Sequence, residues 1–161
     1  MFRDETTAVC GAAKKKMELL EKNPLGYWLM SILAGLFIGL GSVLMGVVGG
    51  VFTAGGAYST KLVCGCVFAV GLCLVTVAGA ELFTGNNFVM AMAGFRKELA
   101  WGKIVKLWVV CWLGNLIGSV LTAVVFTATG IGTGGVAAYL ANAAATKAAG
   151  AAPPLFTKAI F

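Results

Sequence analysis

A long stretch of this chain almost without charge limits what it can fold into. Between Asn23 and Phe95, thiols and tyrosines aside, the only ionisable side chains are Lys61 and Glu81. A helix needs about 20 apolar residues to cross a bilayer, so the stretch has room for two or three crossings. Hydrophobic residues make up 60% of the 161 residues, charged residues 11%, and the mean hydropathy is +0.94, whereas soluble domains carry roughly 25% charged residues. We therefore expect an all-α, polytopic membrane helical bundle.

The charges and cysteines indicate neither a nucleic-acid partner nor a metal site. The net charge of +6 comes from basic residues that flank the apolar runs, where membrane orientation explains them better than nucleic acid does. Four of the five cysteines (Cys64, Cys66, Cys73 and Cys111) lie in apolar runs, where a thiol behaves as a small hydrophobic group. The chain has no histidine to complete a zinc site. No metal, cofactor or catalytic constellation is expected, so the chain is predicted not to be an enzyme.

Residues 1–24 form a polar segment that we expect to lie in the cytoplasm. The segment has no short apolar core followed by a cleavage site, so no signal peptide is predicted. Its sequence "CGAAKKKMELLEK" can form a short amphipathic helix, with Met17, Leu19 and Leu20 against the membrane interface and residues 14–16 near lipid headgroups. A frayed tail is the alternative.

Residues 25–161 are predicted to form the transmembrane domain. Spans are expected at about 25–52, 61–95 and 105–129, followed by a loop with a helical stretch at 130–152 and a fourth span that begins near residue 154. The second span is longer than one crossing needs. Tyr27 and Trp28 resemble an aromatic anchor at the membrane surface. Basic residues gather before the first span and between the second and third, which places the N-terminus in the cytoplasm and Lys147 outside.

Small residues in the first and third spans predict close helix packing. Without a hydrophobic force between helices in lipid, small side chains let two backbones approach each other. The first span carries a glycine-rich face. The packing positions are Gly35 and Gly39 in the first span, and Gly114, Asn115 and Gly118 in the third.

The sequence "GAELFTGNNF", residues 79–88, interrupts the second span with polar residues. Irregular backbone persists in a membrane only inside protein or beside a water-filled cavity, and transporters build ion sites from such broken helices. Gly and Asn tolerate left-handed backbone, and Thr or Asn can cap a new half-helix. We therefore expect the break at Glu81 and the four residues Thr84, Gly85, Asn86 and Asn87. An acid is costly at mid-bilayer, so Glu81 should face protein and accept hydrogen bonds from the loop's amides. Two helices joined by a re-entrant turn, with Glu81 reaching the headgroups, are the alternative.

The sequence "GAELFTGN" closely resembles the signature of the formate/nitrite transporter family. The similarity continues through nearly the whole chain, including "KLVCGCVFAVGLCLVTVA" before the signature, "WGK" in the basic loop and "WLGNLIGS" in the third span. The resemblance implies six spans in two inverted repeats, an aquaporin-like fold and a homopentamer with one pore per subunit. This chain resembles the first repeat plus the start of the fourth span. The family's central histidine, on the fifth span, has no counterpart here.

The resemblance also implies a substrate pathway. The second span would be split by an Ω-shaped loop from Leu82 to about Asn87. The matching positions are Phe68 and Leu72 at the outer constriction, Leu82 and Phe83 at the inner constriction, Thr84 facing the pore centre, and Lys147 near the outer vestibule. The match at Lys147 is weaker, because "AAGAAPP" lengthens the spacing to the next helix.

The implied function is a proton-linked, plasma-membrane channel or transporter for a small monovalent anion: formate, nitrite or hydrosulfide. An anion is costly to move across apolar rings unless it is neutralised, so protonation near the centre would let it pass as the weak acid. Two alternatives are a small proton-coupled multidrug-type exporter that uses Glu81, and a half fragment that does not transport. The residues do not fix the anion, the direction or the gating.

Overall fold

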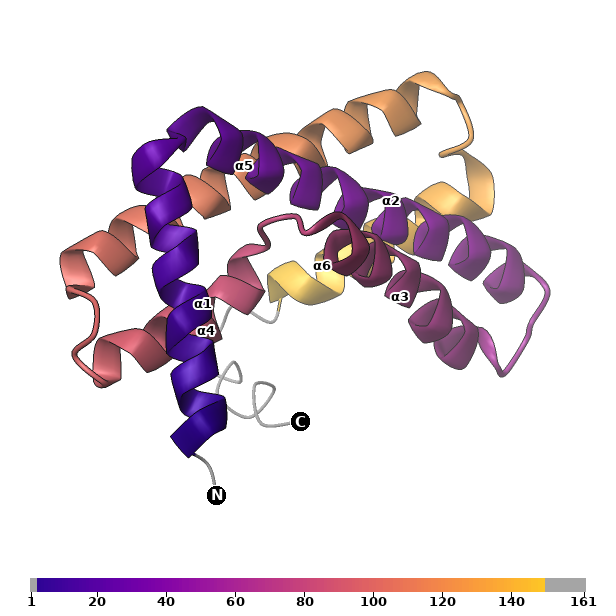
Figure 1. Cartoon of the computed structure of the whole chain (residues 1–161). Helices are drawn as coiled ribbons and strands as arrows, with labels where there is room; N and C mark the ends of the chain where they lie inside the picture. Colours follow the sequence, from indigo (N-terminus) through magenta and orange to yellow (C-terminus); the bar gives the residue numbers. More distant parts are fainter. Residues whose placement is uncertain (1–2, 150–161) are drawn as a thin grey trace.

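The computed structural model describes residues 3–149, which form six α-helices and no strand (Figure 1). The helices are α1 Arg3–Lys22, α2 Pro24–Ala54, α3 Thr60–Ala78, α4 Phe83–Phe95, α5 Trp101–Ala128 and α6 Gly134–Ala149. By length and apolar composition, α2, α3 and α5 can each cross a membrane. The expected all-helical membrane fold is confirmed. The fourth span predicted near residue 154 lies outside the described residues.

Helix α2 is the centre of the bundle, with α5, α3 and α6 packed on it (Figure 1). At the crossing with α5, a Cβ on Gly35 would collide with the backbone carbonyl of Asn115, and one on Gly118 with the carbonyl of Ile32. Only glycine permits this approach, as expected for helices that pack without a hydrophobic force. Gly39 faces the side chain of Thr122 in α5.

The glycines of α2 do not form the single face that their spacing suggests. Gly41 lies against Gly71 of α3, whereas three glycines near the end of α2 receive α6. Those three are Gly46 against Leu140, Gly49 against Tyr139 and Gly50 against Val136. Because different glycines face α5, α3 and α6, α2 can hold three neighbours at once.

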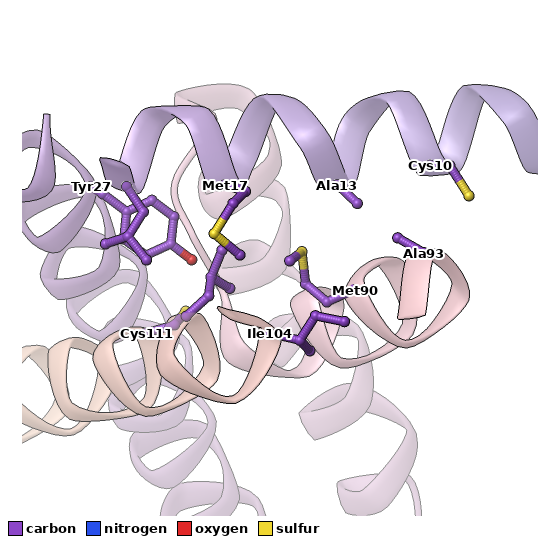
Figure 2. Close-up of a cluster of buried hydrophobic side chains, with 10 residues drawn as sticks. Cys10, Ala13, Met17, Tyr27, Met90, Ala93, Ile104 and Cys111 are labelled. Atoms are coloured by element: carbon purple, nitrogen blue, oxygen red, sulfur yellow. The ribbon is translucent and has the colours of Figure 1, made fainter. Parts of the chain in front are cut away.

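Helix α1 packs on protein along its apolar face (Figure 2). Its buried residues, Cys10, Ala13, Met17 and Leu20, recur at the spacing of one helix face. They meet Met90 and Ala93 of α4 and Ile104 and Leu107 of α5. The prediction that Met17 and Leu20 lie against the membrane interface is wrong, and so is the frayed tail, because α4 and α5 offer a protein surface that buries this face completely.

Charged side chains flank the α1 contact. Lys14 Nζ lies 2.9 Å from Glu98 Oε2, and Lys103 Nζ lies 2.8 Å from Glu21 Oε1. The hydrogen bond from Lys14 lowers the pKa of Glu98 below its usual 4.5. This ion pair therefore supports the folded chain at neutral pH and is lost as the pH falls through the lowered pKa. Such exposed pairs contribute little each, so the buried apolar face carries most of the attachment.

Candidate functional site

The interruption of the second predicted span lies at residues 79–82, between α3 and α4. Gly79 adopts left-handed backbone (φ 63°, ψ 28°) after the last residue of α3. Its N–H donates to the carbonyl of Thr76, and the N–H of Ala80 donates to that of Val75 at 3.0 Å. This is the Schellman pattern that ends a helix at a glycine. Figure 1 shows that α4 does not continue the line of α3.

The predicted Ω-shaped loop from Leu82 to Asn87 is wrong in its position. Helix α4 begins at Phe83, so Thr84, Gly85, Asn86 and Asn87 all lie in its first turns. Gly79 is the residue that breaks the helix. The polar residues after Gly79 lie in regular helix. Asn86 makes its contacts outside α4 through its side chain, and these contacts need no irregular backbone.

One amide side chain from α5 satisfies the backbone of the interruption. Asn115 Nδ2 donates to the carbonyl of Glu81 at 2.9 Å and to that of Ser31 in α2 at 2.8 Å. Its Oδ1 accepts from the N–H of Phe83 at 2.8 Å. The N–H of Glu81 donates to the carbonyl of Met30 at 3.2 Å. The irregular segment is thus tied to both α2 and α5.

The carboxylate of Glu81 is buried, with 5% of the residue exposed. Lys16 of α1 donates to both carboxylate oxygens at 2.7 Å. Asn86 Nδ2 donates to the same carboxylate at 2.9 Å and to the hydroxyl of Tyr27 at 3.0 Å. The prediction that the loop's amides hold Glu81 is wrong, because side chains from α1 and α4 reach the carboxylate instead. Pairing with Lys16 reduces the cost of burying this charge.

A cavity of about 310 Å³ opens beside the interruption and brings several predicted residues together. Leu72 of α3 and Leu82 of the irregular segment line it, with Gly85 and Asn86 from the first turn of α4. Lys16 also lines it. The cavity thus combines apolar side chains with a cation and the start of a helix.

The other predicted pathway residues lie outside this cavity. Phe68 is half-buried, one turn before Leu72 on α3. Phe83 lines a separate, wholly apolar cavity of about 340 Å³ with Trp108 and Trp112. Thr84 is exposed in the first turn of α4, and Lys147 is exposed in the last turn of α6.

Sequence reasoning missed three residues of the Glu81 network: Lys16, Tyr27 and Cys111. Tyr27 was expected as an interface anchor but is fully buried, with its hydroxyl on Asn86. Cys111 Sγ lies 3.2 Å from the carbonyl of Glu81. A signal for Lys16 was present, since it borders the buried face beside Ala13 and Leu20, as Lys14 does on the other edge, whereas Lys15 lies opposite that face.

The sequence model described as "Formate/nitrite transporter" matches residues 4–161. The chain belongs to the formate/nitrite transporter family. Family membership identifies a multi-pass membrane protein of a transporter and channel class, not an enzyme. It confirms the resemblance seen in "GAELFTGN".

Among curated relatives, the chain is 34% identical over 130 residues to "Nitrite transporter NirC" of Salmonella typhimurium, covering 79% of this chain and 46% of the relative. It is 44% identical over 131 residues to "Probable formate transporter" of Methanothermobacter thermautotrophicus, covering 79% and 47%. A solved "FNT family ion channel" matches with a TM-score of 0.74 and 32% identity, over 80% of this chain and 51% of that one. The chain spans about half the length of these relatives.

Proposed function

We propose that this member of the formate/nitrite transporter family lines a pore for a small monovalent anion (formate, nitrite or hydrosulfide) that crosses together with a proton. The observation that carries the proposal is the cavity beside the interrupted helix, where Leu72 and Leu82 meet the first turn of α4. The named relatives are a nitrite transporter and a probable formate transporter, which supports an anion of this size.

The first turn of α4 has the groups that an anion needs. Within residues 3–149, the N–H groups of Thr84 and Gly85 have no acceptor, and both residues are exposed. Free N–H groups and the positive end of the helix dipole favour an anion. Leu72 and Leu82 make the charged form costly to move, so a proton that neutralises the anion would lower the barrier.

The open side of the cavity must face protein or a water-filled space rather than lipid. Gly79 and Gly85, which line it, are exposed, as is Thr84 in the same turn of α4, and lipid does not tolerate irregular backbone or unpaired N–H groups. We therefore propose that the described residues form one wall of the pore and that a further protein segment forms the other. The family resemblance supports a homopentamer in the plasma membrane, and the distribution of basic residues supports a cytoplasmic N-terminus.

The structure favours this function over a proton-coupled multidrug-type exporter. Such an exporter would use Glu81 as an accessible proton carrier, but Lys16 and Asn86 occupy both oxygens of its carboxylate. Family membership also supports anion transport. A chain that does not transport by itself is the second candidate, and the open cavity is the observation that favours it.

Replacing Thr84 tests the pore assignment. We expect Thr84→Val to reduce formate and nitrite flux about tenfold in liposomes that contain the natural protein, because one hydrogen bond to a charged group contributes roughly 1.5–3 kcal/mol. Thr127→Val is the matched control, since Thr127 is exposed on α5 and its hydroxyl donates only to the carbonyl of Val124. Unchanged flux in correctly assembled Thr84→Val would contradict the proposal. Flux in the natural protein but none with residues 1–161 reconstituted alone would favour the second candidate.

A further inference from the structure

A groove lies where α1, α2 and α5 meet, at the end of the bundle where α2 begins. Its volume is about 500 Å³, and its walls are mainly apolar: Leu25 and Trp28 from α2, Val110 and Leu113 from α5. A neighbouring cavity of about 340 Å³ shares three lining residues with it, Leu20, Pro24 and Lys106. The two together form a trough that is apolar along α2 and α5 and charged where α1 ends.

The charged end of the trough has two cations and one anion among its lining residues. Lys103 and Glu21 line it and pair with each other at 2.8 Å. Lys106 lines both cavities, and within residues 3–149 it has no ion-pair or hydrogen-bond partner. The first turn of α2 adds the positive end of a helix dipole beside it. The charged end therefore favours an anionic group.

The position of Trp28 at the start of a candidate span implies that the apolar end lies where acyl chains begin. Both α2 and α5 are apolar enough to span a bilayer, and the groove follows the first turns of α2. Trp28 is 38% exposed and Leu25 63% exposed. Tryptophan at the end of a span marks the level of the headgroups. A molecule that fits this trough has an anionic head and an apolar tail.

We propose that this trough binds an acidic phospholipid, with its phosphate beside Lys106 and one acyl chain along Trp28, Val110 and Leu113. Basic pockets between membrane helices hold acidic headgroups in this manner. An acidic lipid brings a net negative charge to the unbalanced cation, whereas a zwitterionic lipid adds a second cation next to it. The proposal does not depend on anion transport.

The test compares the natural protein with Trp28→Phe in phosphatidylcholine vesicles, so that the difference between their fluorescence is the Trp28 signal among the four tryptophans of residues 1–161. Brominated phosphatidylglycerol should quench the Trp28 signal at a lower mole fraction than brominated phosphatidylcholine does. We expect Lys106→Gln to weaken this preference about fivefold, the effect of one basic residue near a membrane surface, and Lys106→Arg to retain it. Lys15→Gln is the matched control, because Lys15 is exposed on α1 and has no partner among the described residues; it should leave the preference unchanged.

Four results would overturn the proposal. Equal quenching by the two lipids would mean that Lys106 only extends towards water, as lysines at span ends often do. An equal loss in Lys15→Gln would indicate diffuse surface charge. Specific quenching that survives in Trp28→Phe would place the lipid elsewhere. An absence of Trp28 quenching by either lipid would show that protein, such as a second copy of the chain, covers the groove.

Discussion

At the scale of single residues, two asparagines organise the interrupted helix. Asn115 supplies the donors and the acceptor that the backbone lost when α3 ended, and Asn86 joins Glu81 to Tyr27. An amide side chain suits this task because it donates and accepts at once. Neither contact distorts the helix that carries the asparagine. Glu81 and Asn86 of the signature thus act through their side chains.

Asn115→Leu should destabilise the protein strongly at nearly constant volume. The substitution removes three hydrogen bonds and leaves the N–H of Phe83 without its acceptor. Each lost bond contributes about 0.5–1.5 kcal/mol, and an unsatisfied buried group costs roughly 1–3 kcal/mol. We expect a loss of about 3 kcal/mol or more in unfolding free energy, measured by denaturant unfolding in detergent. Asn142→Leu, at an exposed position of α6, is the control. Equal stability of the two variants would refute the assigned role.

Lys16 and Glu81 should behave as one unit. Lys16→Met leaves the buried carboxylate without its cation, and breaking a buried pair costs about 3–5 kcal/mol; because a quarter of the Lys16 side chain is exposed, the low end of that range is expected. Adding Glu81→Gln should recover much of the loss. The thermal unfolding of both single variants and the double variant measures the coupling. Additive effects would mean that the ion pair contributes nothing to stability.

At the scale of elements, glycine determines how closely the helices approach α2. Gly35 and Gly118 meet backbone at the α2–α5 crossing. Helix α6 instead lays the side chains of Leu140 and Tyr139 over Gly46 and Gly49, and its backbone reaches α2 only at Gly50. The same residue type therefore serves two kinds of packing. Helix α1 differs from both, since it uses an ordinary apolar face on α4 and α5.

Gly118→Ala should weaken the bundle by about 3 kcal/mol, since the added methyl meets the carbonyl of Ile32 and overpacking costs roughly 1–3 kcal/mol or more. Gly65→Ala is the matched control: nothing lies within 4 Å of its Cβ position on α3, and alanine favours a helix by up to about 1 kcal/mol over glycine. Thermal stability in detergent compares the two. Similar melting temperatures would show that the α2–α5 crossing can move apart without loss.

At the scale of the whole molecule, the features that depend on local composition were predictable. The apolar runs indicated the membrane helices, and the signature indicated the family. The position of the interruption was predicted a few residues too late, because a single left-handed glycine, Gly79, ends α3 before the polar residues begin. The partner of Glu81 was not predicted because Lys16 lies 65 residues away in the sequence, and only the packing of α1 brings the two together.

The orientation of the whole molecule can be tested by labelling. In a variant without its native cysteines, Lys147→Cys should react with a membrane-impermeant maleimide on intact cells, because the basic residues favour a cytoplasmic N-terminus and an external α6. Lys15→Cys should react only after the membrane is permeabilised. Both side chains are exposed, so burial does not limit the reaction. The reverse pattern would show that the chain is inserted the other way round.

The hydrogen bonds between Asn115 and the interrupted segment also have a consequence for biogenesis. The ribosome makes the interrupted segment first, and the residue that satisfies the carbonyl of Glu81 follows 34 positions later. Until α5 has entered the membrane, the backbone of residues 79–82 lacks that partner, and lipid cannot replace it. The nascent segment therefore stays in a polar environment, such as the insertion machinery or the membrane surface, until α5 is inserted. Helices α3 and α4 can adopt their final positions only after that step.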